Sequence, residues 1–416
     1  MGYGEWGIVD TWRRKKPEFW NTKKAYSPVR ILYTSFTEPA ERKVLYVPVQ
    51  NRFDHTSLNE LTITLRYKNK DQVLEPVDIE PHARGNIPVN IEGWEPGDIA
   101  FIYFYDRKGY LVDSCTILLQ SGDIPARNTD SAGQLQVSEN EDQIIVQSDK
   151  DRKLVFDKTT GLVEGLQTPE DTLLLHGPFL NLRTRGPELA YTNNEINDYG
   201  GEWKAERVSC ALEGSEAVVR LKGTYSGLIP VLFEIHVSSG GEIRTMYRLE
   251  KVQQEYIREA GIKWILEDRY DSLSWSRKTY WSSYPEGYIS APSGKVSLYS
   301  SAINKYRQQP VKDWEYDTKS FYYDGIGNEK PGEQLTNIAR ATKEKIYEYS
   351  LMNNGKKVLS VEGNGEDGCR IAKQGKELFL FVNNELDYVD ISWGNYQRNI
   401  LLKDGYTAEA VMKIDQ

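Results

Sequence analysis

The chain has 416 residues, of which 39% are hydrophobic and 27% charged, a composition typical of a globular protein with more than one core. Its formal charge of −9, from 52 basic and 61 acidic residues, argues against nucleic acid as the main partner. No apolar run reaches the roughly 18 residues that predict a membrane span. No signal peptide is visible at the N-terminus, so the localisation is left unassigned.

The cysteines and histidines predict no metal site, no disulfide framework and no cofactor. Cys115, Cys210 and Cys369 are far apart and odd in number, and no CxxC motif occurs. Only four histidines are present, which weakens the case for histidine-based catalysis. The acidic, glycine-containing stretch 362–368 lacks the spacing of an EF-hand and is interpreted as a turn. Phosphate-binding glycine loops and a GxSxG nucleophile motif are absent from the sequence.

A short helix is predicted near the N-terminus, over about residues 16–27. Pro17 suits the first helical position, Lys23 and Lys24 suit the last turn, and Pro28 ends the helix. Isolated helices shorter than about 12–15 residues are marginal in water, so its aromatic side chains must pack on something. Two interpretations stay open at this point. The helix packs on the next domain, or it was the last element of a domain that is absent here.

Residues 29–120 predict a small all-β domain of the immunoglobulin or fibronectin type. The stretch 106–109 predicts a hairpin turn between its last two strands. Seven runs read as strands because they alternate or are continuously apolar, namely 29–36, 43–51, 61–69, 77–81, 86–91, 98–106 and 110–120.

A linker is predicted at 121–134, which is rich in Gly, Pro, Ser, Asp and Asn and has no periodicity. The region 135–416 is again strand-rich, with a tight turn expected at 238–241. So much antiparallel sheet must close into barrels or stack as large sheets to avoid exposed edges. A large β-supersandwich is therefore expected.

Aromatic residues are abundant, with 27 Tyr, 11 Phe and 10 Trp. Such a content suits β-sandwiches, because aromatic residues have high strand propensity. It also suits carbohydrate binding, because the apolar faces of sugars pack on aromatic rings. Any single Trp is more often a core residue than a sugar platform.

The order of these parts resembles the C-terminal portion of glycoside hydrolase family 2, the β-galactosidase and β-glucuronidase group. The stretches 7–10, 13–17 and 24–26 are similar to the end of that family's catalytic (β/α)8 barrel. Residues 29–120 resemble the immunoglobulin-like domain that follows the barrel. The region from 135 onward looks like the small-chain supersandwich domain, which is related in fold to galactose mutarotase. The resemblance implies that residues 1–28 are a remnant of the barrel's last strand and helix.

Three residues are implied by the resemblance to contact carbohydrate. The stretch HGPFLNLRTRGP places Arg183 at the family's arginine position. The segment around Trp275, together with 284–288, is similar to the family's tryptophan- and tyrosine-containing stretch. Spacing to the last strand places Trp393 on the tryptophan that reaches over the active site and stacks on sugar.

The resemblance implies a non-catalytic role for this chain. The family's two catalytic glutamates lie on earlier barrel strands, upstream of Met1, so no catalytic residue is expected here and the enzyme status is left open. The implied partners are a galactoside or related glycoside, the missing barrel, and further subunits.

Two alternatives are kept. The chain could be a freestanding carbohydrate-binding protein that uses Trp203, Trp281 or Trp393 as a platform. It could also be an aldose epimerase, with His176 or His236 as the acid and a carboxylate as the base.

Overall fold

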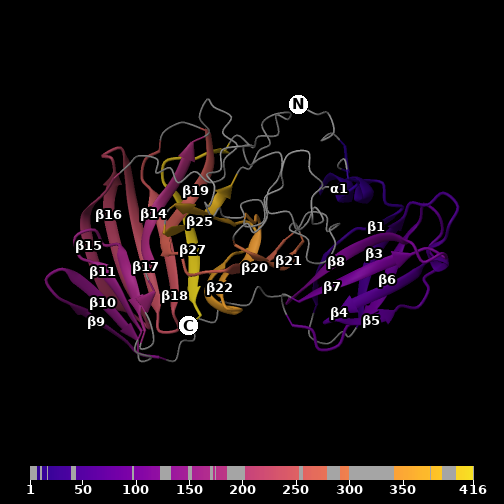
Figure 1. Ribbon diagram of the computed structural model, residues 1–416, viewed down its shortest axis with the longest axis horizontal. Helices are drawn as coiled ribbons and strands as arrows, with labels where there is room; N and C mark the ends of the chain where they lie inside the picture. Colours follow the sequence, from indigo (N-terminus) through magenta and orange to yellow (C-terminus); the bar gives the residue numbers. More distant parts are fainter. Residues whose placement is uncertain are drawn as a thin grey trace. The chain divides into compact units, whose positions relative to one another are not determined.

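The computed structural model describes residues 7–9, 12–15, 17–38, 44–95, 98–121, 133–148, 152–168, 172–173, 175–184, 202–252, 256–278, 291–298, 342–374, 376–386 and 400–415. The elements within these ranges are strands apart from one α-helix and one 3-10 turn, η2 (Leu58–Glu60) (Figure 1). The chain divides into two compact units. The described residues up to 121, together with Ala291 and Pro292, belong to the first unit, and the other described residues belong to the second. The prediction of an all-β chain with a small β-sandwich followed by a large one is confirmed. The exact domain boundaries at 28, 120 and 134 stay predictions.

The first unit is a sandwich of a three-stranded and a five-stranded sheet. One sheet has the order β1 (Val29–Ile31), β3 (Val44–Asn51), β6 (Arg84–Asn90). The other has the order β2 (Ser35–Glu38), β8 (Leu111–Ser121), β7 (Ile99–Tyr105), β4 (Thr62–Tyr67), β5 (Lys70–Val73). Inward-facing apolar residues from both sheets form one core, which includes Val47, Ile63, Ile87, Ile102 and Phe104.

Two of the predicted strands differ from the structure. The run 29–36 is split, because β1 pairs with β3 in one sheet while β2 pairs in parallel with β8 in the other. The run 77–81 is no strand, because Pro76 precedes it and Pro81 ends it, and neither proline has the N–H group that a ladder needs. The carbonyl of Ile79 in this run instead accepts hydrogen bonds from Leu58 N and from the side chain of Asn51. The polar strand β5 was missed, because all four of its side chains are exposed.

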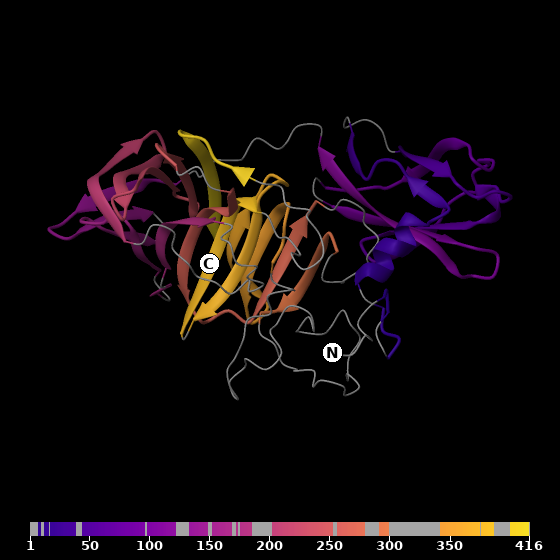
Figure 2. The ribbon, with the colours of Figure 1, turned by 90° about the horizontal axis from the view of Figure 1, so that it is seen from above.

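The predicted N-terminal helix is present as α1 (Pro17–Ala25); it belongs to the first unit and contacts strand β8 of its sandwich (Figure 2). Lys24 Nζ lies 2.9 Å from Asp113 Oδ2 at the start of β8, and the Ser27 hydroxyl donates to the same oxygen at 2.6 Å. Burial lowers the pKa of Lys23, which donates to the carbonyl of Leu111. Of the two interpretations, packing on the next domain thus has direct structural support. The assignment of residues 1–28 to a barrel stays a prediction.

The second unit contains two larger sheets. The ten-stranded sheet has the order β24 (Gly368–Gln374), β25 (Glu377–Leu386), β19 (Tyr256–Glu267), β14 (Leu175–Thr184), β12 (Val163–Gln167), β11 (Lys153–Asp157), β10 (Gln143–Ser148), β9 (Leu135–Glu139), with β13 (Thr172–Leu173) beside β12 and β26 (Ile400–Leu401) beside β19. The nine-stranded sheet has the order β15 (Trp203–Glu213), β16 (Glu216–Tyr225), β17 (Ile229–Ser238), β18 (Glu242–Leu249), β27 (Tyr406–Ile414), β23 (Lys356–Glu362), β22 (Ile346–Asn353), β20 (Ser272–Arg277), β21 (Ser293–Ser297).

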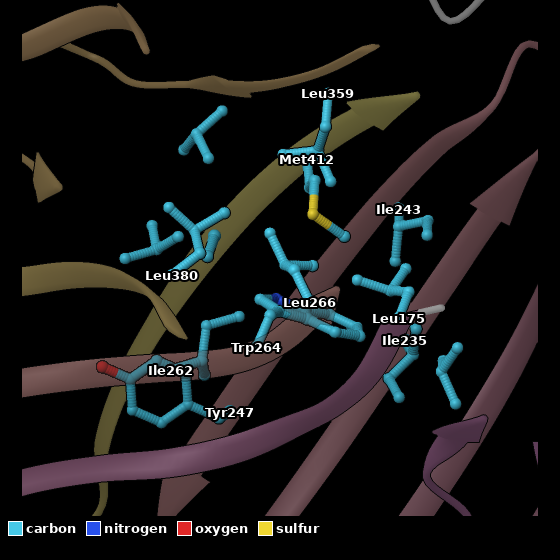
Figure 3. Packing of buried hydrophobic residues seen from close by; sticks show 14 of the residues in the cluster. Leu175, Ile235, Ile243, Tyr247, Ile262, Trp264, Leu266, Leu359, Leu380 and Met412 are labelled. Atoms are coloured by element: carbon cyan, nitrogen blue, oxygen red, sulfur yellow. The ribbon is translucent and has the colours of Figure 1, made fainter. Parts of the chain in front are cut away.

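One continuous hydrophobic core lies between these two sheets (Figure 3). Trp264 and Leu266 of β19 belong to the ten-stranded sheet, and Ile243 of β18 and Met412 of β27 belong to the nine-stranded sheet. Since side chains alternate along a strand, the neighbours of these residues in sequence point to the outside of the sandwich. On β19 these outward neighbours are the polar residues Lys263 and Glu267, and Ile265, which packs in a small separate cluster with Phe379 and Phe381. The polar residues on this face lead to the candidate site. In the part of the chain covered by the structure, no helix has the length and apolar character needed to cross a membrane.

Candidate functional site

Polar side chains gather on the outward face of four neighbouring strands, β14, β19, β25 and β24. The pairing registers align Arg183 with Glu259, Asn181 with Gly261 and Asn383, and Phe179 with Lys263 and Phe381. Arg370 on β24 pairs with Phe381. We name six buried side chains on this surface the polar face: Asn181, Arg183, Glu259, Lys263, Arg370 and Asn383.

Glu259 is the centre of the polar face and is only 1% exposed. Arg370 donates from Nε to Oε1 and from Nη2 to Oε2 of Glu259, each at 2.8 Å. Asn181 Nδ2 donates to Oε2 at 2.8 Å, and Arg183 Nη1 lies 3.6 Å from Oε1. Such a forked arginine–carboxylate pair is the strongest type of charge-assisted contact in proteins.

The ionised form of Glu259 is favoured despite its burial. Loss of solvent alone would raise the pKa of this carboxyl, but the charge and hydrogen bonds of Arg370, with Asn181 and Arg183, hold the pKa below its usual value. Glu259 is therefore not a proton donor near neutral pH. Its chemical role in the polar face is to hold arginine and amide groups in place.

A glycine makes room for the amide pair of the polar face. A Cβ on Gly261 would lie 2.0 Å from the carbonyl oxygen of Val382 and 2.7 Å from Cα of Asn383. With no side chain there, Asn181 Nδ2 reaches across Gly261 and lies 2.8 Å from Asn383 Oδ1. Close approach of β19 and β25 at this point therefore depends on the missing side chain.

Aromatic rings lie beside the cations of the polar face. The guanidinium carbon of Arg370 is 3.5 Å from the ring centroid of Phe381. Lys263 Nζ is 5.6 Å from the rings of both Phe179 and Phe379. These distances are within the range of cation–π attraction, which strengthens when the cation is desolvated.

An open pocket of about 790 Å³ lies at the other end of the same strands. Its volume is within the range of small-ligand sites. His176 is exposed there, and its ring packs edge-on against Phe179 with centroids 5.0 Å apart. The walls combine apolar and ionisable side chains: Glu164, Leu175, His176, Ile265, Leu266, Glu267, Asp268, Lys376 and Glu377.

Of the three sequence-predicted sugar contacts, the structure describes Arg183 and Trp275, which lie on strands of different sheets. Arg183 lies in the polar face and is buried. Trp275 on β20 is also buried, belongs to the core between the sheets, and has Lys343 Nζ 4.0 Å from its ring centroid. Trp393 and Trp281 lie outside the described residues. Whether any of the three contacts sugar stays a prediction.

Trp203, named for the platform alternative, is half-buried. Its ring packs against Tyr225 and Phe233, with centroids 5.1 and 5.6 Å apart, and its Nε1 donates to the carbonyl of Thr160. This environment is that of a core-edge residue.

His236, named for the epimerase alternative, lies between two carboxylates on the outward face of the nine-stranded sheet. Nδ1 is 2.8 Å from Glu216 and Nε2 is 2.8 Å from Glu234. Arg244 donates a hydrogen bond to Glu216, and Arg220 donates one to Glu234. Both nitrogens of His236 are thus already engaged.

Sequence reasoning missed most of the polar face. Glu259 and Lys263 alternate with apolar residues in the stretch IREAGIKWILE, a pattern that predicts a strand with one solvated face. The structure instead buries both side chains. No cluster of three or more His, Cys, Asp or Glu suited to a metal is found among the described residues.

Comparison with known proteins leaves the family open. The sequence matches no protein-family model and no curated protein. Solved structures with some likeness include galactose 1-epimerase from Lactobacillus acidophilus NCFM, at 9% identity and a TM-score of 0.31, covering 67% of this chain and 97% of that one. A beta-arabinopyranosidase is 10% identical with a TM-score of 0.26, covering 68% of this chain and 39% of that one. At these TM-scores the likeness assigns neither a family nor a function.

Proposed function

We propose that this chain is the non-catalytic, carbohydrate-contacting C-terminal region of a β-galactosidase-like family 2 glycoside hydrolase, whose parent reaction is the hydrolysis of β-glycosides. The observation that carries the proposal is the position of Arg183. The arginine that the sequence resemblance singles out lies in the polar face, in contact with Glu259.

The polar face supports this role by fixing the end of β25. Asn383 is held by Asn181, and Leu386 pairs with Glu259 at the last residue of the strand. The chain continues from Leu386 towards Trp393, the residue proposed to stack on sugar. Because the polar face is buried, its proposed role is to hold β25 in place and not to contact the sugar.

Two measurements on the purified chain test the proposal. Incubation with nitrophenyl glycosides should give no turnover, and activity that survives further purification would overturn the non-catalytic role. Titration with galactosides, followed by tryptophan fluorescence, should show binding that Trp393→Ala removes. Trp12→Phe, at an exposed tryptophan of the first unit, serves as the matched control and should bind as the wild type does.

The remaining outcomes decide between the alternatives. Absence of binding at millimolar galactoside would contradict sugar contact. Binding retained in Trp393→Ala and lost in Trp203→Ala would favour the freestanding carbohydrate-binding protein. Accelerated mutarotation of galactose or glucose that is lost in His236→Ala would favour the epimerase.

A further inference from the structure

Three aromatic side chains form a row on the outward face of the five-stranded sheet in the first unit. Phe101, Tyr103 and Tyr105 alternate along β7 with Ile102 and Phe104, which are fully buried in the core. The ring centroids of Phe101 and Tyr103 are 6.4 Å apart with planes 23° from parallel. Those of Tyr103 and Tyr105 are 6.3 Å apart and 26° from parallel. We name these three residues the aromatic row.

The aromatic row is unusual for its place in the sandwich. The outer face of an antiparallel sheet is ordinarily polar, because it is in contact with water. All three rings are only partly buried, although β7 lies in the middle of the sheet between β8 and β4. Contiguous apolar side chains on such a face are a feature of binding surfaces.

The strands on both sides of the aromatic row carry hydroxyl groups. On β4, Thr62 pairs with Tyr105 and Thr64 with Tyr103. On β8, Ser114 pairs with Tyr103 and is half-buried, whereas Thr116, which pairs with Phe101, is only 6% exposed. Polar groups that both donate and accept hydrogen bonds thus border an apolar strip, which is the arrangement of a ligand site that fixes orientation at its edges.

The charges at the aromatic row compensate one another. Arg66 lies with its guanidinium carbon 5.2 Å from the ring centroid of Tyr103. The same guanidinium is paired with Asp71 of β5, through Nε to Oδ1 at 2.7 Å and Nη2 to Oδ2 at 2.9 Å. A neutral ligand therefore matches this surface. A nucleic acid, which also stacks on aromatic rings, is disfavoured by the −9 charge of the chain.

We propose that the aromatic row binds a neutral polysaccharide chain. Sugar C–H faces pack on the rings of Phe101, Tyr103 and Tyr105. Sugar hydroxyls exchange hydrogen bonds with the hydroxyls of Thr62, Thr64 and Ser114, which are exposed or half-buried. Three rings in line suit a chain of several sugar units better than a monosaccharide. This site lies in the first unit and does not depend on the proposed function of the second.

Affinity electrophoresis of the whole chain tests the proposal. Native gels cast with arabinogalactan, galactan, xylan or mixed-linkage β-glucan should retard the wild type in at least one case, and anionic polygalacturonate should not. Tyr103→Leu keeps an apolar side chain but removes the ring, and it should weaken binding about tenfold. Tyr46→Leu, at a tyrosine that is 60% exposed on the other sheet of the same unit, is the matched control and should migrate as the wild type does.

Other outcomes overturn the proposal. Equal retardation of wild type and Tyr103→Leu, with circular dichroism showing both folded, would exclude the aromatic row. Should Tyr103→Leu fail to fold, Phe101→Leu and Tyr105→Leu take its place with the same expectation. No retardation of the wild type in any gel would exclude a polysaccharide ligand. A wild-type dimer that Tyr103→Leu converts to a monomer, measured by light scattering, would make the row an interface between copies. Trp393→Ala should leave the retardation unchanged, which separates this site from sugar contact in the second unit.

Discussion

Replacing Arg370 by methionine tests whether the polar face holds a true buried ion pair. The substitution removes both 2.8 Å hydrogen bonds from the guanidinium to Glu259 and the contact with the Phe381 ring. Glu259 keeps hydrogen bonds from Asn181 at 2.8 Å and from Asn383 at 3.4 Å, and the more distant charge of Arg183 at 3.6 Å. A buried carboxylate is thereby left with much of its charge uncompensated.

The expected loss in free energy of unfolding is about 3–5 kcal/mol, the range found when one partner of a buried ion pair is removed. Differential scanning calorimetry of the whole chain measures it as a lower midpoint for the second unit. Arg248→Met, at an exposed arginine on β18, is the control and should leave that midpoint near the wild-type value.

A double variant distinguishes the loss of the Arg370–Glu259 attraction from the cost of leaving the Glu259 carboxylate buried without its main partner. Arg370→Met with Glu259→Leu removes the carboxylate as well, and apolar replacements of whole buried pairs are often close to neutral. The double variant should therefore be more stable than Arg370→Met alone by at least about 1 kcal/mol. If Arg370→Met and the Arg248→Met control had the same midpoint, Glu259 would not depend on Arg370, and the reasoning would fail.

Three further predictions follow from packing and charge. Gly261→Ala should destabilise the second unit by about 1–3 kcal/mol, because the new Cβ would lie 2.0 Å from the Val382 carbonyl oxygen. In the control Gly165→Ala, the new Cβ would lie 3.6 Å from the Leu173 carbonyl oxygen, and stability should change little. Equal calorimetric midpoints for the two variants would contradict this. Asp113→Ala should lower the free energy of unfolding by about 3 kcal/mol and make the lysines of α1 accessible to trypsin, because the buried carboxylate accepts hydrogen bonds from Lys24 and Ser27. Unchanged tryptic cleavage of the folded variant would count against this. The folded-state pKa of Glu259 lies below the ordinary value of 4.5, so the ionised carboxylate stabilises the fold above pH 4.5, and this stabilisation is lost as the pH falls through the folded pKa. In an acid titration, the free energy of unfolding should therefore fall more steeply below pH 4.5 for the wild type than for Glu259→Gln. Parallel curves for the two proteins would refute this.

The elements of the fold were largely predictable from local patterns. Alternation of apolar residues identified β7 and β17, and the turns at 106–109 and 238–241 fall between paired antiparallel strands as expected. Pro17 and the lysines near Ala25 correctly bracketed α1. The wrong strand predictions fall where the hydrophobic pattern of a segment does not match its hydrogen-bond pairing in the structure. The run 77–81 has the sequence of a strand, but the carbonyl of Ile79 accepts hydrogen bonds from the Asn51 side chain and the Leu58 N–H and not from a neighbouring strand. Strand β5 could not be predicted from apolar alternation, because all four of its side chains are exposed.

The candidate site was less predictable, for a physical reason. Arg183 was identified only through resemblance, and Trp275 was identified in the same way but lies in the core. In the sequence, Glu259, Lys263 and Arg370 lie at positions that alternate with apolar residues, as on a strand face in contact with water. Alternation shows which side chains share a face of a sheet, but it does not show whether that face is buried.

The sequence by itself predicted an all-β chain, a small sandwich before a large one, and the short helix α1. Alternation, turn residues and cysteine spacing are local, so each is readable along the chain. Only the tertiary structure decided that Glu259, Asn181, Arg370 and Asn383, which are far apart in sequence, meet on one face. That meeting depends on the order of strands in the sheet and on the register that Gly261 permits. Both are set by long-range pairing, which a single sequence does not encode in any local pattern.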